Sequence, residues 1–259
     1  MRLGLMQGRL AVPAKGHIQE FPDNWEDEFA VLRECGLVGV EWLITCGSRD
    51  TNPLLTDPET VNHHPVLSVC VDTLVHEKII DATYLSHNLE DLCDSLMAFT
   101  DIRNVTIPLL EASSMVEETI RSQFCQLMKP IGEKYPEIRF SFEAELGIMP
   151  LQEILSLCDN FYVTYDTGNI TSYGLDHAEY VRALFPKINN VHLKDRTFDA
   201  RTVAPLHGDT NFEEIFKLLK EVGYNGAYIL QTARGPTGHE KQTILNHIEI
   251  FRELYERSV

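Results

Sequence analysis

Four apolar segments in the second half of the chain end in side chains that can bind a metal ion or move a proton. They are residues 140–143, 162–166, 190–194 and 227–231, and they carry Glu143, Asp166, His192, Lys194 and Gln231. A strand that is buried on both faces is a continuous apolar run, and a parallel barrel collects the ends of its strands at one mouth. These oxygen and nitrogen donors are therefore expected to converge there, as a divalent metal site with room for a substrate requires.

The elements that position these side chains follow from the pattern along the chain. Weaker apolar runs predict further strands at 2–7, 38–41, 67–72 and 105–108, and helical periodicity predicts helices at 25–35, 89–99, 116–134, 151–157, 178–184, 212–222 and 242–255. Strands that alternate with helices in this way indicate the α/β class and a single (β/α)8 TIM barrel. A length of 259 residues suits this fold as one domain, residues 1–259. Residues 46–64 are predicted to be a loop with a short helix near 58–61, placed to cover the barrel mouth.

Composition narrows the class of protein. A hydrophobic share of 44% with 24% charged residues is typical of a soluble globular protein. The formal net charge of −17 argues against a nucleic-acid partner, because phosphate backbones are bound by basic surfaces. The six cysteines form no CxxC pair, and no apolar run is long enough to cross a membrane. We therefore expect a cytoplasmic protein with reduced thiols and no membrane contact.

The motifs at the strand ends resemble those of a known superfamily. Tyr165-Asp166-Thr167-Gly168-Asn169, Val191-His192-Leu193-Lys194-Asp195-Arg196 and Ile229-Leu230-Gln231, preceded by Phe142-Glu143, follow the order found in xylose isomerase-like (β/α)8 barrels. The opening Gly4-Leu5-Met6-Gln7-Gly8-Arg9-Leu10 and the segment Gln231-Thr232-Ala233-Arg234 resemble a sugar phosphate isomerase/epimerase subgroup that is often linked with polysaccharide precursors. The resemblance covers essentially the whole chain.

This resemblance implies one divalent metal ion and a set of ligands for it. The implied ligands are Glu143, Asp166 and His192, with a fourth position that falls on Gln231 where the common pattern has a glutamate. A Gln carbonyl oxygen can bind a hard cation but cannot accept a proton at neutral pH. Three oxygens and one nitrogen suit Mn²⁺, which we favour, with Mg²⁺, Co²⁺ and Zn²⁺ as alternatives.

The missing glutamate bears on the reaction. Sugar epimerases of this superfamily use two glutamates, one on each face of the substrate, whereas aldose–ketose isomerisation through a metal-stabilised enediolate can use one base on one face. Gln231 therefore favours an isomerase, with epimerisation as an option. Glu143 is the preferred base and Glu145, two residues further along the strand direction, is the second candidate. Lys194 completes the catalytic candidates.

Further polar residues near the strand ends are candidates for binding a small sugar or sugar phosphate. They are Gln7, Arg9, Glu41, Asn169, Arg196, His207 and Arg234. Guanidinium groups offer paired donors to a phosphate or carboxylate, but a salt-bridged rim is an equally open interpretation. Asp166 can also be an N-cap, His192 a core histidine and Gln231 a structural amide.

Two other functions stay open beside the sugar isomerase. A non-catalytic or regulatory sugar-binding protein on the same scaffold is the first, and Gln231 motivates it. A metal-dependent phosphoesterase of the endonuclease type is the second, but it needs more strand-end histidines and a basic surface, which this chain lacks. The family analogy also raises the option of a homo-oligomer.

Overall fold

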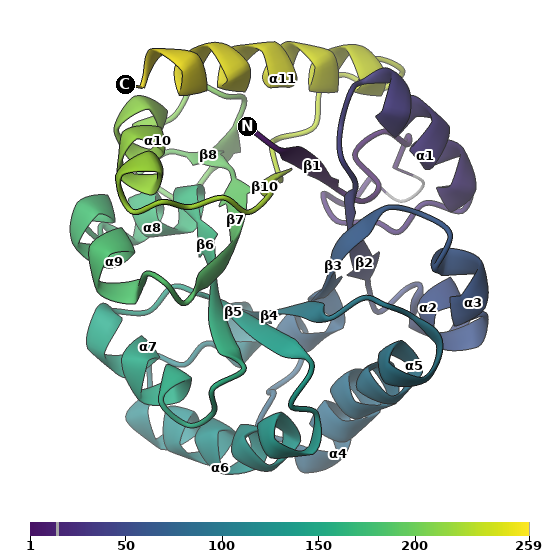
Figure 1. Cartoon of the computed structure of the whole chain (residues 1–259), viewed down its shortest axis with the longest axis vertical. Coiled ribbons are helices and arrows are strands. Elements are labelled where there is room, and N and C mark those ends of the chain that lie inside the picture. The colour runs from purple at the N-terminus through teal and green to yellow at the C-terminus, as the bar shows by residue number, and fades with distance from the viewer. Residues whose placement is uncertain (14–15, 259) are drawn as a thin grey trace. The chain divides into compact units, whose positions relative to one another are not determined.

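The structure is a computed structural model that describes residues 1–13 and 16–258. Eight parallel strands form a closed barrel in the order β1-β10-β7-β6-β5-β4-β3-β2, with flanking helices (Figure 1). The strands are β1 (Leu3–Met6), β2 (Val40–Ile44), β3 (Val66–Val71), β4 (Asn104–Leu109), β5 (Arg139–Ala144), β6 (Phe161–Asp166), β7 (Ile188–Leu193) and β10 (Tyr228–Leu230). Each overlaps a predicted apolar run, and the predicted TIM barrel is confirmed. The run predicted at 38–41 is wrong in its end, because β2 continues to Ile44 and Glu41 lies inside the strand.

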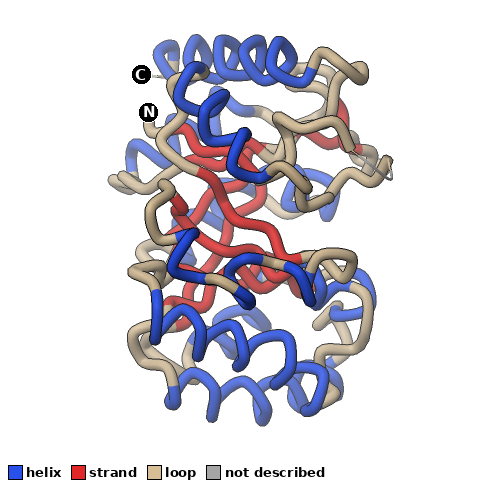
Figure 2. The backbone as a smooth tube through the Cα atoms, turned by 90° about the vertical axis from the view of Figure 1, so that its right-hand side faces the viewer, coloured by secondary structure: helices blue, strands red, loops and turns tan. Residues whose placement is uncertain are grey.

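The predicted helices are also present, and their alternation with the strands can be followed along the tube in Figure 2. They are α1 (Trp25–Glu34), α5 (Asp91–Phe99), α6 (Glu118–Lys134), α7 (Ile148–Leu155), α9 (His177–Leu184), α10 (Phe212–Glu221) and α11 (Glu240–Arg257). The short helix expected near 58–61 is α3 (Pro58–Val61). Among the described residues, no helix has both the length and the apolar character needed to cross a membrane.

Several short elements were not predicted. They are α2 (Pro53–Thr56), α4 (Ala82–Leu85), α8 (Thr167–Tyr173), the single turns η1 (Arg49–Thr51), η2 (Asp72–Val75), η3 (Ser86–Glu90) and η4 (Glu111–Ser113), and the antiparallel pair β8 (Asp195–Arg196) and β9 (Thr202–Val203). Helices of one or two turns are not stable by propensity alone and depend on tertiary contacts. Their sequences therefore carry little periodic signal.

By its internal contacts the chain divides into two compact units, Glu41–Thr164 and the combination of Met1–Val40 with Tyr165–Val259. In the first unit, the ring of Phe142 on β5 lies edge-on to Phe124 of α6 at 5.8 Å and to Phe161 of β6 at 5.1 Å. Successive residues of a strand point to opposite faces. Because Phe142 faces the helices, the next residue, Glu143, faces the other side of the strand.

The second unit contains an aromatic cluster over β10. Tyr228 packs against Phe216 of α10 at 5.8 Å and against Tyr255 of α11 at 5.9 Å, and the two helices lie side by side in Figure 1. Tyr228 therefore faces the helices, and alternation places Gln231, three residues later, on the opposite face. On β6 the same rule applies to Tyr165, which stacks on Tyr180 of α9 at 5.9 Å, and to its neighbour Asp166.

We expect two histidines of this unit to make the free energy of unfolding sensitive to acid. Burial lowers the pKa of His177 and of His247 to about 4. The unfolded chain takes up these protons near pH 6.5, whereas the folded protein takes them up only near pH 4. The stability that each neutral imidazole contributes is therefore complete above pH 6.5 and is lost as the pH falls to 4, by up to about 3 kcal/mol for each histidine.

We expect His247→Gln to flatten this acid limb. The free energy of unfolding, measured in urea between pH 7 and pH 4, should fall by at least about 1 kcal/mol less in the variant than in the wild type. His207→Gln is the control, because His207 is exposed and should leave the profile unchanged. Parallel wild-type and His247→Gln profiles would refute the assignment.

Candidate metal centre

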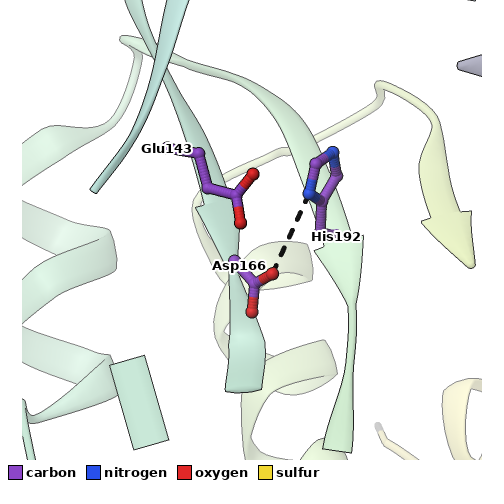
Figure 3. Close-up of side chains that lie close together, drawn as sticks. All are labelled: Glu143, Asp166 and His192. Atoms are coloured by element: carbon purple, nitrogen blue, oxygen red, sulfur yellow. Dashed lines mark ion pairs between the residues drawn. The ribbon is translucent and has the colours of Figure 1, made fainter. Parts of the chain in front are cut away.

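Glu143, Asp166 and His192 come together as a buried cluster. One possible ligand atom from each residue lies within 4.8 Å of the others, and none of the three residues is more than 2% exposed. Figure 3 shows the two carboxylates and the imidazole projecting toward one another from β5, β6 and β7. The three ligands that the motifs implied are thus within reach of a single cation.

Asp166 divides its two oxygens between two tasks. Oδ1 accepts a hydrogen bond of 2.8 Å from the backbone N–H of Asn169 and so caps the N-terminus of α8. Oδ2 lies 3.9 Å from Nδ1 of His192 and 2.7 Å from Nζ of Lys194. Asp166 is therefore both the N-cap of α8 and a charged residue of the cluster.

The imidazole of His192 is fully buried and is oriented by its own strand. Nδ2 of Asn190 lies 3.3 Å from Nε2 of His192. If the Asn190 amide is turned so that its oxygen accepts Nε2–H, Nδ1 is left with a lone pair toward Asp166, as a metal-binding histidine requires. Asn190 was not predicted, although a position two residues before His192 shares its strand face.

Gln231 lies one residue beyond β10. Its side chain is on the face of the strand opposite to Tyr228, which faces the helices. Its backbone N–H donates to the carbonyl of Leu193 at 3.2 Å, which fixes its place beside the end of β7. The side chain is buried, and its Oε1 accepts no hydrogen bond from the described residues. A buried carbonyl oxygen without a donor costs about 1–3 kcal/mol. A bound cation would satisfy this oxygen, and the role of Gln231 as the fourth ligand stays a prediction.

Lys194 is held at this site by the start of α8. The hydroxyl of Thr167 accepts from the backbone N–H of Lys194 at 3.0 Å and donates to its carbonyl at 2.8 Å. A methyl group at Gly168 would lie 3.0 Å from Cγ of Lys194, so the lysine stem packs closely against this glycine. Nζ also lies 3.5 Å from Oδ1 of Asn169, one of the predicted substrate-binding residues. Thr167 was missed because a threonine after a strand has no distinctive sequence signal.

Arg9 and Arg234 bind backbone carbonyls. Nε of Arg9 donates to the carbonyl of Thr232 at 3.2 Å, and Arg234 donates to the carbonyls of Ile18 and Ala11 at 3.1 Å each. Both residues thus fasten the segment that follows β1. A substrate-binding role for them stays a prediction.

Glu28 of α1 also binds the segment that follows β1. Its carboxylate accepts from the backbone N–H groups of Gly8 and Leu10 at 2.9–3.0 Å. Burial raises the pKa of Glu28, and the two N–H groups and the charge of Arg234 oppose that rise. A cavity of about 380 Å³ lies beside this anchor, lined in part by Val12, Phe21 and Asp27.

The other predicted residues have varied surroundings. Gln7, just past β1, is fully buried, and so is Glu41, which accepts a hydrogen bond of 2.6 Å from Ser68. Glu145 lies one residue beyond β5 and is half-buried. Arg196 donates to Ser172 at 3.3 Å. His207 is exposed and lies 3.1 Å from the carbonyl of Pro205.

A chain of hydrogen bonds that begins at Tyr165, the residue before Asp166, connects α8 with the loop after β7. His177 bonds Tyr165 Oη at 2.6 Å through Nδ1 and Thr171 Oγ1 at 3.0 Å through Nε2. Thr171 in turn bonds Thr210 at 3.1 Å, and the Thr210 backbone N–H donates to the buried Asp195 at 3.3 Å. Tyr165, next to Asp166, and Asp195, next to Lys194, are therefore connected by hydrogen bonds through neutral side chains.

Comparison with known proteins agrees with the motifs. Residues 138–254 match the family model described as a xylose isomerase-like TIM barrel, which confirms the predicted resemblance. Inosose dehydratase from Clostridium tetani is 25% identical over 134 residues, which are 43% of this chain and 45% of that protein. The chain thus matches less than half the length of that relative.

Solved structures share the fold over essentially the whole chain. A D-tagatose 3-epimerase-like protein superposes with a TM-score of 0.70 at 20% identity, covering 98% of this chain and 99% of that one. The IolI protein, solved with a bound zinc atom, has a TM-score of 0.75 at 13% identity and coverage of 100% and 99%. The 3-keto-D-glucoside 4-epimerase from E. coli superposes with a TM-score of 0.70 at 15% identity, covering 98% of this chain and 100% of that one.

Proposed function

We propose that the protein is a divalent-metal-dependent enzyme that moves a proton at the carbon next to the carbonyl of a sugar or sugar phosphate. The buried Glu143–Asp166–His192 cluster is the observation that carries this proposal. The relatives support it, since part of the chain is similar in sequence to an inosose dehydratase and several sugar epimerases share the fold. Aldose–ketose isomerisation is the reaction we favour.

The donor set suits one divalent cation per chain. Glu143, Asp166 and His192 would hold it together with Gln231, whose buried oxygen lacks a hydrogen-bond donor among the described residues. The cation supplies positive charge to the carbonyl and hydroxyl oxygens of the substrate. We retain Mn²⁺ as the first choice, and the zinc bound in the IolI protein makes Zn²⁺ the next metal to test.

The protein's own groups divide the remaining work. The Glu143 carboxylate takes the proton from the carbon next to the carbonyl and returns it to the former carbonyl carbon on the same face, while the hydroxyl proton passes from one substrate oxygen to the other. Lys194 donates a hydrogen bond from its ammonium to a substrate oxygen and so stabilises the negative charge that develops there. Gln231 cannot act as a second base, which is why we favour isomerisation over epimerisation.

Dehydration is a second candidate because of the similarity to inosose dehydratase. It begins with the same loss of a proton next to a carbonyl and differs in the next step, in which a hydroxyl group leaves with a proton from an acid. We assign the role of this acid to Lys194. The two reactions therefore share Glu143 and differ in their product.

The test is proton exchange in D₂O, followed by NMR on a panel of aldoses, ketoses, inososes and their phosphates. We expect wild-type protein with Mn²⁺ to introduce deuterium next to the carbonyl, and Glu143→Gln to reduce that rate by at least about 10³-fold. Glu145→Gln is the matched control and should keep most of the rate. The product, a rearranged sugar or an enone, identifies the reaction.

A different set of results would refute the proposal. Exchange that survives in Glu143→Gln but is lost in Glu145→Gln would transfer the base to Glu145. Binding of sugars without exchange at any carbon would favour the non-catalytic sugar-binding protein. The cytoplasmic location and a homo-oligomer belong to the same proposal and are checked by cell fractionation and by light scattering.

A further inference from the structure

Lys194 brings a positive charge next to Asp166, and both residues belong to the same compact unit. Nζ of Lys194 lies 2.7 Å from Oδ2 of Asp166, the oxygen that also faces Nδ1 of His192. The other Asp166 oxygen already accepts the N–H of Asn169. A divalent cation bound by Asp166 would therefore share Oδ2 with a buried ammonium.

The ammonium is kept there by its surroundings. Thr167 holds the Lys194 backbone by two hydrogen bonds, and Gly168 packs against the stem of the side chain. Only 7% of Lys194 is exposed, so solvent screens its charge weakly. Two like charges that share one carboxylate oxygen in such surroundings repel each other.

We propose that Lys194 lowers the affinity of the centre for its divalent cation. This inference rests on the proposed metal-dependent function and adds a property of the same site. A substrate oxygen that accepts a hydrogen bond from Lys194 draws the ammonium away from Asp166 and strengthens cation binding. Cation and substrate affinities are then coupled, and by thermodynamic linkage each increases the other by the same factor.

The test is calorimetric titration of chelator-stripped protein with Mn²⁺ at one fixed pH and ionic strength. We expect Lys194→Met to bind Mn²⁺ at least ten-fold more tightly than the wild type, because it removes the opposing charge and keeps most of the stem. Lys194→Gln is a second variant in case the first fails to fold. Lys217→Met makes the same change of net charge on an exposed position of α10 and should bind as the wild type does.

Each other outcome has a definite meaning. Equal Mn²⁺ affinity in the Lys194 and Lys217 variants would overturn the inference while leaving the metal site intact. Weaker binding in the Lys194 variants would also overturn it and would make Lys194 a residue that positions Asp166. Absence of Mn²⁺ binding in the wild type and all variants would remove the metal site and the inference together.

Discussion

Replacing His192 with alanine should remove the metal ion from the protein. The imidazole is the single nitrogen donor of the cluster and is fully buried beside Asp166. Its loss removes one of the three buried candidate ligands, so we expect divalent metal affinity to fall by about 100-fold or more. Elemental analysis of purified protein should give near one ion per chain for the wild type and far less for His192→Ala.

The control for this result is a histidine outside the cluster. His207→Ala also removes an imidazole, but His207 is exposed and lies 3.1 Å from the carbonyl of Pro205, so this variant should retain its metal. Circular dichroism must show that both variants are folded. Equal metal content in His192→Ala and wild type would place the ion elsewhere and would refute the centre described above.

Replacing Gly132 with alanine should lower stability although alanine is the better helix former. A methyl group at this position of α6 would lie 2.5 Å from Cε1 of Phe161 and 2.8 Å from Sγ of Cys158. Phe161 is itself fixed between Phe140 at 6.1 Å and Phe142 at 5.1 Å. Overpacking costs about 3 kcal/mol and helix propensity returns about 1 kcal/mol, so we expect a net loss of about 2 kcal/mol in the free energy of unfolding.

Gly147→Ala separates the steric effect from a general effect of glycine replacement. The nearest atom to a methyl group there is Cδ of Pro150 at 3.9 Å, and Gly147 is the N-cap of α7, so this variant should lose no more than about 1 kcal/mol in the free energy of unfolding. A double-mutant cycle adds the second check. Gly132→Ala should cost less in a Phe161→Leu background, and additive effects would contradict the assigned contact.

The barrel and the core of the site could be predicted because both follow from periodicity. Glu143, Asp166 and His192 each close or nearly close an apolar strand, and parallel strands in a barrel deliver such residues to one end. The order of the motifs then indicated a resemblance to one superfamily, and residues 138–254 match the model of a family described as a xylose isomerase-like TIM barrel. The ligand role of Gln231 stays a prediction.

The supporting contacts could not be predicted, because they depend on which groups meet across distant segments. Glu28 is an ordinary acidic residue in the first turn of a helix, and only the fold shows that it binds the backbone of Gly8 and Leu10. Arg9 and Arg234 offered donors for a phosphate, but sequence cannot show that backbone carbonyls already accept from them. α8 was missed because it follows β6 without a loop.

The small β8–β9 hairpin has a consequence for directed evolution of this barrel. Its base is fixed, since Asp195 accepts from the backbone of Gly208 and Thr210, and a methyl group at Gly208 would lie 2.2 Å from Oδ1 of Asp195. Its tip, residues 198–200, is exposed. A library that randomises these tip residues should therefore leave the backbone that carries Lys194 in its place.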